Sequence, residues 1–517
     1  MTRRRPELRQ HPLIRAARQG LLHCAVLGPV FAHAQADQQS DARKVQLVQP
    51  RIAVSQIVSD NVRLTTAKDD GLITTVTPGI AVFSNSGRVR GSLDYSLSGV
   101  VYTKTTEKDR FQQALAAQGN VEAISNWFYV DARASISQQT RSAFGVVSSD
   151  GRLGKQNRTD VYSLGLSPYV KGQLAGLANY QVRADLSESR AKDTSSGDAS
   201  NRGGLIRLDG LGSQRLLNWS ALLQTQRSEP GDGRRTETES LTGSLHVRPD
   251  VDWHLILTGG RERNDFSSSA KRGDNTYGLT VNWTPTPRTK TNADWQYHSY
   301  GNTHNFSVEH RMARSVWRVV DSQSVNNSGQ QNGSGQQSNH DLLFLQFASI
   351  EPDPIRREQL VNSFLQRNGL SPDAIATSGF LTNAVSLARR QELSLALLGV
   401  RTTLTLLLSR SNSRRLDALA QVQDDLSQST HVLQRGVTVN LAHQLTPTSS
   451  LSLILMRQEN RGDSSSLSSE LKTIVANWTR RLGMRTSVQL GVRHAEFDSL
   501  SQPYQENAIF ATFVQQF

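Results

Sequence analysis

The chain has 517 residues, a formal net charge of +13 and a mean hydropathy of -0.46. Beyond the amino-terminal segment no run approaches the ~18 apolar residues of a membrane helix, which excludes a helical membrane protein. Gly, Ser, Thr, Asn and Gln occur throughout, and no change of texture divides the sequence into the several soluble domains that its length would allow.

The first residues have the pattern of a secretory signal peptide. Several arginines are followed by a mostly apolar segment at residues 20–31 and by a small-x-small motif. We expect cleavage after Ala34 or Ala36, so that the signal peptide 1–34 takes the single cysteine, Cys24, with it. This removes six arginines and one glutamate, and the net charge falls to +8. A mixed polar surface explains that value better than a nucleic-acid-binding face does.

The mature chain, residues 35–517, shows the period of two that predicts β-strands. In one segment an apolar row alternates with a small polar row: Leu93, Tyr95, Leu97, Gly99 and Val101 against Ser92, Asp94, Ser96 and Ser98. One face of such a strand suits lipid and the other suits water. We therefore expect an all-β fold, a large single-chain antiparallel transmembrane β-barrel of about 18–22 strands, an even number. A soluble β-sandwich or propeller would hide its apolar rows and needs no signal peptide.

The best-formed hairpin lies in the middle of the chain. Its apolar row is Tyr277, Leu279, Val281 and Trp283, followed after a turn by Ala293, Trp295 and Tyr297. The opposite row predicts side chains that line the lumen: Asn282, Thr284, Asn292, Asp294 and Gln296.

Turns and loops indicate the two sides of the membrane. The short Pro-containing turns at residues 286–289 and 446–448 are typical of the periplasmic side of such a barrel. The longer polar stretches at residues 190–202 and 261–275 are typical of the extracellular side.

The last stretch, residues 504–517, predicts the strand that closes the barrel. One face carries Ile509, Ala511, Phe513, Gln515 and Phe517. Phe513 and Phe517 are the signal of a closing strand, although Gln515 departs from the apolar residue that is usual at that step.

Two segments break the rhythm of the strands. Residues 321–340 are rich in Asn, Gln, Ser and Gly and predict a polar loop. Residues 352–388 predict a short helical insertion, because Asp353 can cap a helix and Pro354 suits its first turn. The insertion either plugs the lumen or packs beside the rim, and we favour the rim.

Several stretches carry a family resemblance: residues 77–80, 93–97, 127–145, 314–317, 353–357 and 379–383, together with the terminal Phe517. In them the sequence resembles the outer-membrane β-barrel proteins associated with the PEP-CTERM sorting system, which accompany exopolysaccharide loci. The resemblance implies a Gram-negative outer-membrane protein that helps to export or assemble an exopolysaccharide. Its expected partners are outer-membrane lipid and lipopolysaccharide, the barrel assembly machinery and polysaccharide export proteins, with no nucleic acid.

Catalytic motifs are missing from the sequence. It has no H-E-x-x-H and no G-x-S-x-G, and its histidines are scattered. The adjacent carboxylates Asp69–Asp70 and Asp424–Asp425 would point to opposite faces of a strand. We expect no enzyme, cofactor or metal site. The alternatives are a general diffusion porin and a barrel-embedded surface hydrolase assembled from distant strands.

Overall fold

The computed structural model describes residues 45–212, 216–231, 233–268, 270–327, 338–347, 357, 360–362, 364–365, 377–417 and 424–517. The chain divides into two compact units, Met1–Arg43 and Lys44–Phe517, and all described residues belong to the second. The predicted signal peptide therefore lies outside the described residues.

In the described part of the second unit the chain forms twenty-two β-strands. Their alternating sequences suit a wall with one face in lipid and one in water. The strands are β1 (Val45–Ser59), β2 (Gly71–Asn85), β3 (Val89–Thr103), β4 (Arg110–Ile124), β5 (Phe128–Thr140), β6 (Arg158–Leu174), β7 (Ala178–Ala191), β8 (Ala199–Gly210), β9 (Leu217–Pro230), β10 (Thr236–Val247), β11 (Trp253–Asn264), β12 (Arg272–Thr286), β13 (Thr289–His298), β14 (Gly301–Arg311), β15 (Ser315–Asn326), β16 (Ser386–Leu398), β17 (Thr402–Arg415), β18 (His431–Thr446), β19 (Ser449–Arg461), β20 (Ser468–Arg481), β21 (Thr486–Ser499) and β22 (Tyr504–Gln516).

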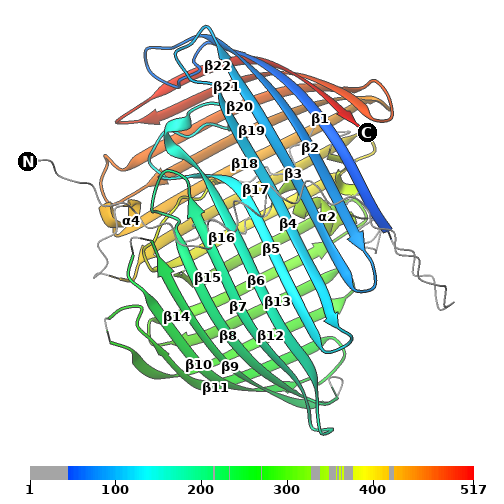
Figure 1. Ribbon diagram of the computed structural model, residues 1–517, viewed down its shortest axis with the longest axis vertical. Coiled ribbons are helices and arrows are strands. Elements are labelled where there is room, and N and C mark those ends of the chain that lie inside the picture. The colour runs from blue at the N-terminus through cyan, green and yellow to red at the C-terminus, as the bar shows by residue number, and fades with distance from the viewer. Residues whose placement is uncertain are drawn as a thin grey trace, which may run out of the picture. The chain divides into compact units, whose positions relative to one another are not determined.

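The strands close into a barrel. Each pairs antiparallel with its neighbours in sequence, and β1 pairs with both β2 and β22 (Figure 1). Val54 lies opposite Phe513, and Phe517 donates its N–H to the Pro50 carbonyl at 3.0 Å. The expected all-β antiparallel barrel is confirmed, with a strand number at the upper end of the expected range.

The two ends of the barrel differ. Short turns such as 86–88, 287–288 and 447–448 lie at the end where β1 begins and β22 ends, which we call the short-turn end. The opposite, long-loop end carries the connections 141–157 and 327–385. The Pro-containing turns and the polar stretches thus lie at opposite ends, as predicted. The polar loops themselves are shorter than predicted, 192–198 and 265–271, because the paired strands on either side extend into them.

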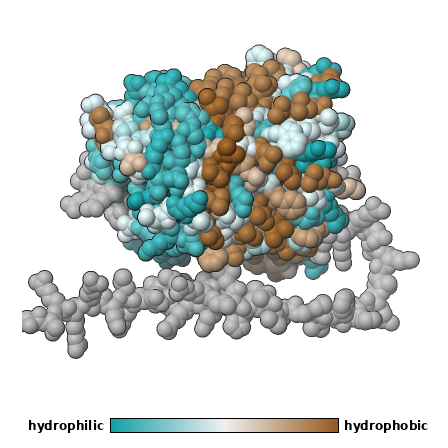
Figure 2. Space-filling model, turned by 90° about the horizontal axis from the view of Figure 1, so that it is seen from above, coloured by the Kyte–Doolittle hydropathy of each residue, from teal (hydrophilic) through white to brown (hydrophobic). Residues whose placement is uncertain are grey.

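The wall turns apolar side chains outward and polar side chains inward, as strand alternation requires. On β17, Leu404, Leu406 and Leu408 point outward, whereas Thr403 and Thr405 point inward and are buried. The predicted apolar row of β3 is also on the outside, where Leu93 and Val101 are exposed. Figure 2 shows a band of apolar side chains beside a hydrophilic region on one face of the barrel. Such a surface suits lipid rather than water.

The segment between β15 and β16 differs from its prediction. β15 continues to Asn326, so the polar loop predicted at 321–340 begins later. The helix α2 (Asn339–Gln346) starts inside that predicted loop, where Ser338 and Asp341 form a capping box. Within the predicted helical insertion 352–388 the described residues between 357 and 365 are helical. The described residues 377–385 are not helical, and residues 386–388 already belong to β16.

The helix α2 packs inside the barrel. Leu342 and Leu343 are fully buried in a cluster with Val316, Ala396 and Ala442, which belong to the inner face of β15, β16 and β18. Gln346 Nε2 donates to the carbonyl of Met312 at 3.4 Å, which places α2 near the short-turn end. The position beside the rim was predicted for residues 352–388, which begin after α2. Val361 and Leu365 of that segment are buried in the same cluster against the inner wall, so the predicted rim position is wrong for them. No helix among the described residues is long and apolar enough to cross a membrane.

Candidate functional site

Four of the five predicted lumen residues share the inner face of β12 and β13. Asn282 lies opposite Asn292, whose Nδ2 donates to Asn282 Oδ1 at 2.6 Å. Asp294 accepts hydrogen bonds from Gln296 Nε2 and from Thr280 Oγ1, the latter at 2.5 Å. The row therefore contains two hydrogen-bonded groups, the amide pair of Asn282 and Asn292 and the set of Thr280, Asp294 and Gln296.

Thr284 does not belong to this row. The pairing of β12 and β13 shifts between Trp283 and Thr286, and Thr284 stands in that irregularity. It is exposed, and its N–H donates to the Asp252 carbonyl in the neighbouring turn at 2.8 Å. A bulge at the short-turn end thus removes Thr284 from the regular alternation on which its prediction rested.

The lumen wall around the row consists mainly of neutral polar groups. A cavity of about 850 Å³ lies along the inner face from β8 to β15, and its lining includes Gln224, Thr238, Ser240, Thr242, Thr258 and Thr276. A second cavity of about 830 Å³ lies along β3 to β9, with Gln118, Ser135, Ser163, Ser187, Asn201 and Gln226 in its lining. Hydroxyl and amide groups both donate and accept hydrogen bonds, so these surfaces suit solutes rich in hydroxyl groups.

The connection 141–157 at the long-loop end folds inward and narrows the lumen on the side away from the row of β12 and β13. Its Val146, Val147 and Leu153 pack in one buried cluster with inner-wall side chains such as Ile73 and Phe497. Burial of these apolar groups is the main force that holds the connection inside the barrel. We call residues 141–157 the inward loop.

Side chains of the wall also satisfy the backbone of the inward loop. Tyr504 donates its hydroxyl to the Val147 carbonyl at 2.6 Å, and Tyr102 donates to the Arg152 carbonyl at 2.7 Å. Arg110 donates to the same Arg152 carbonyl at 3.1 Å. Buried carbonyls need such partners, so wall and loop are matched to one another.

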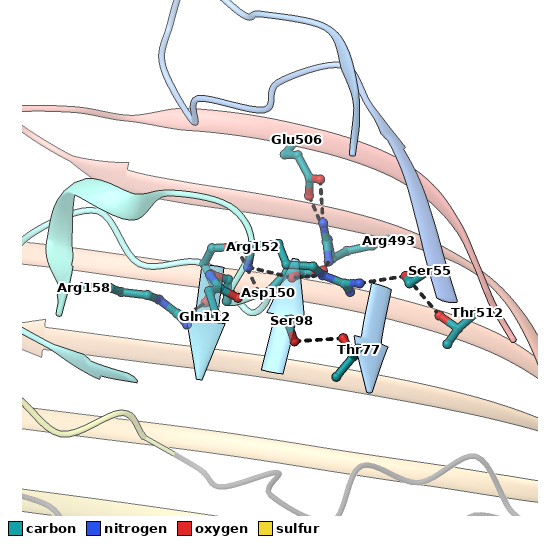
Figure 3. A network of polar contacts seen from close by, with 12 residues as sticks. Ser55, Thr77, Ser98, Gln112, Asp150, Arg152, Arg158, Arg493, Glu506 and Thr512 are labelled. Carbon is teal, nitrogen blue, oxygen red and sulfur yellow. Dashed lines mark hydrogen bonds and ion pairs between the residues drawn. The ribbon is translucent and has the colours of Figure 1, made fainter. Parts of the chain in front are cut away.

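A buried ion network joins the inward loop to the wall (Figure 3). Arg493 of β21 donates Nη1 to Asp150 Oδ2 and Nη2 to Glu506 Oε1, both at 2.8 Å. Arg152 Nε donates to Asp150 Oδ1 at 2.8 Å, and Arg152 Nη1 donates to Ser55 Oγ at 2.7 Å. Burial by itself raises the pKa of Asp150, but Arg152 and Arg493 outweigh it and hold the pKa well below its ordinary value.

A second contact joins the inward loop to the short helix α4 (Asp425–Gln428). Ser142 Oγ donates to Asp425 Oδ1 at 2.7 Å, and the Ala143 N–H donates to Asp425 Oδ2 at 2.6 Å. The adjacent Asp424 accepts from Thr382 Oγ1 at 2.6 Å, so three chain segments meet here. The sequence prediction treated these two aspartates as strand residues. They lie instead at the start of a helix, where both carboxylates bind neighbouring segments.

This contact predicts a pH dependence. Burial raises the pKa of Asp425 to about 6, the Asp424 carboxylate adds to the rise, and the hydrogen bonds from Ser142 and Ala143 oppose it. Because the folded pKa lies above that of an unfolded aspartate, the contact strengthens as the pH falls from about 7 towards 4, by up to about 3 kcal/mol. We expect fewer channel openings at pH 5 than at pH 7.5 in a lipid bilayer.

Asp425→Asn is the matched variant for this pH dependence. A neutral amide can accept from the Ala143 N–H and donate to Ser142 Oγ. At pH 7.5 the variant should open as rarely as the unsubstituted barrel does at pH 5. Its channel openings should therefore differ little between pH 5 and pH 7.5. An unchanged pH dependence in Asp425→Asn would show that another group controls it.

Sequence reasoning missed a hydrogen-bonded chain of three side chains on the inner wall. Ser220 Oγ lies 2.8 Å from His246 Nε2, and His246 Nδ1 lies 3.0 Å from His254 Nε2. A hydroxyl, a base and a group that orients the base are what nucleophilic catalysis needs. The residues come from β9, β10 and β11, so only strand register brings them together, and no sequence motif could have revealed them.

The closed antiparallel wall, the apolar outer surface and the polar lumen together define a transmembrane β-barrel. No protein-family model matches the sequence, and no curated protein is similar to it in sequence.

Solved structures of outer-membrane barrels are similar to this chain in fold at 9–11% sequence identity. The siderophore receptor PirA from Pseudomonas aeruginosa matches with a TM-score of 0.37 and 10% identity, over 92% of this chain and 81% of PirA. The FrpB iron transporter from Neisseria meningitidis (F5-1 variant) matches with a TM-score of 0.47 and 9% identity, over 91% of this chain and 81% of FrpB. A BenF-like porin from Pseudomonas fluorescens Pf-5 matches with a TM-score of 0.35 and 9% identity, over 91% of this chain and 99% of the porin. The barrel assignment rests on this chain's own strand pairing.

Proposed function

We propose that this chain is a Gram-negative outer-membrane barrel that provides a hydrated, gated path for an exopolysaccharide during its export or assembly. The observation that carries the proposal is the neutral polar wall of the lumen, where hydroxyl and amide groups line a cavity of about 850 Å³. Many weak hydrogen bonds of this kind can replace water around a sugar polymer without holding it in one place. The barrel itself then catalyses nothing.

The family resemblance adds the partners to this proposal. It links the chain to a PEP-CTERM sorting system, to polysaccharide export proteins and to the barrel assembly machinery. The apolar outer band fits contact with outer-membrane lipid, and the long-loop end would face the cell exterior.

A general diffusion porin would share the polar lumen but would conduct ions constitutively. The inward loop counts against it, because buried ion pairs and an apolar cluster hold the loop inside the barrel. Salt-dependent conductance without any trigger, together with loss of small-solute uptake on deletion, would favour the porin.

A hydrolase is favoured by one observation, the chain of Ser220, His246 and His254. It predicts that the purified barrel hydrolyses an ester and that Ser220→Ala abolishes the activity while the barrel still assembles. Our proposal predicts that Ser220→Ala exports polymer normally.

The location of exopolysaccharide in a clean deletion strain tests the proposed function. Polymer is measured separately in the periplasm and in the culture medium, with a complemented strain as the control. We expect it to accumulate in the periplasm and to disappear from the medium, because its path through the outer membrane is missing. Unchanged secretion would contradict the export role and would favour the porin.

A further inference from the structure

Two arginines on the outer surface of the barrel lie directly opposite one another on neighbouring strands. Arg410 of β17 and Arg435 of β18 are direct cross-strand partners, and both point outward. Side chains in such positions have Cβ atoms about 5 Å apart, and like charges there repel. Among the described residues neither guanidinium forms an ion pair, whereas other arginines of this surface do.

The nearby carboxylates are already engaged. Arg389 Nη2 pairs with Asp321 Oδ2 at 2.7 Å, and Arg457 Nε pairs with Glu470 Oε1 at 2.6 Å. Glu459, which lies opposite Arg435, pairs with Arg461. The opposed pair therefore carries surplus positive charge that an anion from outside the chain can neutralise.

An apolar groove of about 740 Å³ adjoins the opposed pair. Arg410 and Arg435 belong to its lining together with outward-facing apolar side chains, Phe306, Val319, Leu393, Leu408 and Val437. The ion-paired residues Asp321, Arg457 and Glu459 also border it. Leu408 precedes Arg410 by two residues on the same face, and Val437 follows Arg435 by two. The arginines thus stand where the apolar surface gives way to the polar one on the side of the long-loop end.

We propose that the opposed pair and the groove bind a phosphorylated glycolipid of the outer leaflet. Its phosphate accepts paired hydrogen bonds from the two guanidinium groups, and its acyl chains occupy the groove. A soluble anion would use the arginines but not the groove, and an unphosphorylated lipid would use the groove but not the arginines. The outer-leaflet assignment rests on the proposed outer-membrane location; the binding itself is independent of polymer export.

The test measures lipid binding to the purified full-length barrel by native mass spectrometry. The probes are bisphosphorylated lipid A, dephosphorylated lipid A and inorganic phosphate. Arg410→Gln with Arg435→Gln should weaken binding of the bisphosphorylated lipid roughly 10- to 100-fold, because charge-assisted hydrogen bonds are lost. The dephosphorylated lipid should bind the unsubstituted barrel and the double variant equally weakly.

Arg202 and Arg227 give a matched control. They are likewise direct cross-strand partners on the outer face, but Arg227 forms an ion pair with Glu229. Arg202→Gln with Arg227→Gln should leave lipid binding unchanged. Retention of the folded mobility in unheated gel electrophoresis shows that each variant is assembled.

Three results would overturn the proposed lipid site. One is equal binding of bisphosphorylated lipid A by Arg410→Gln/Arg435→Gln and by the unsubstituted barrel. Another is equal binding of lipid A with and without its phosphates, which would show a purely apolar groove. The third is inorganic phosphate bound as tightly as the lipid, which would show a simple anion site. Each result leaves the export proposal standing, since that depends on the lumen.

Discussion

The Arg493→Met barrel is expected to melt at a lower temperature than the unsubstituted barrel and to conduct ions far more often in a lipid bilayer. Arg493 is 5% exposed, and it binds Asp150 of the inward loop and Glu506 of the wall at the same time. Without it Glu506, itself 1% exposed, keeps only the Ser59 hydroxyl at 3.0 Å among the partners in the described part of the chain. Leaving one partner of a buried ion pair uncompensated costs about 3–5 kcal/mol.

The same substitution weakens the hold on the inward loop. Asp150 keeps Arg152, but both of these residues lie in the loop, so the direct salt bridge from Asp150 to β21 is lost. Each 1.4 kcal/mol by which the closed position of the loop is destabilised relative to the open position raises the ratio of open to closed pores about tenfold. Thermal melting and single-channel recording measure the two effects separately.

A second substitution separates stability from gating. Arg493→Met combined with Glu506→Gln removes the unpaired buried charge and should recover most of the melting temperature. Its conductance should stay high, because the link to Asp150 is still missing.

Arg389→Met is the matched control for Arg493→Met. The pair of Arg389 with Asp321 has a similar length, 2.7 Å, but the Arg389 side chain is 49% exposed. Its loss should change stability by less than about 1 kcal/mol and leave conductance unchanged. If Arg493→Met conducts no more than the unsubstituted barrel, the inward loop does not control the pore.

The wall of the barrel could be predicted from the sequence, because one strong period, the two-residue alternation of β-strands, governs it. The hairpin of β12 and β13 illustrates this, since the predicted turn at 286–289 encloses the observed turn 287–288. Its predicted inner row also shares one face, except where the bulge displaces Thr284. Alternation over an isolated strand pair needs no information from the rest of the chain.

The contacts inside the barrel could not be predicted from the sequence, because they join residues far apart in the chain. Asp150 and Arg493 are separated by 343 positions, and the closure of β1 on β22 brings them to the same side of the lumen. The inward loop has no period of its own. Its ion partner on the wall, Arg493, does not stand out among the charged residues of the strands. The helix α2 was missed for a related reason: its start lies at the edge of a stretch rich in Asn, Gln and Ser, and its four apolar residues are consecutive, so they show no helical period.

A label placed in the lumen tests most directly whether polymer passes through this barrel. Thr242 of β10 lines the inner cavity, whereas Thr225 of the neighbouring β9 has the opposite parity and faces outward. The chain's only cysteine, Cys24, lies in the predicted signal peptide, so Thr242→Cys or Thr225→Cys gives one reactive thiol in the mature chain. A bulky maleimide is attached in cells, and a gel shift measures the labelled fraction.

Exopolysaccharide in the medium is then compared at equal labelling. The proposed path predicts that label on Thr242→Cys stops secretion and retains polymer in the periplasm, while label on Thr225→Cys has no effect. Normal secretion from cells whose Thr242→Cys barrels are fully labelled would contradict it, because a polymer that crosses the lumen has to pass that position.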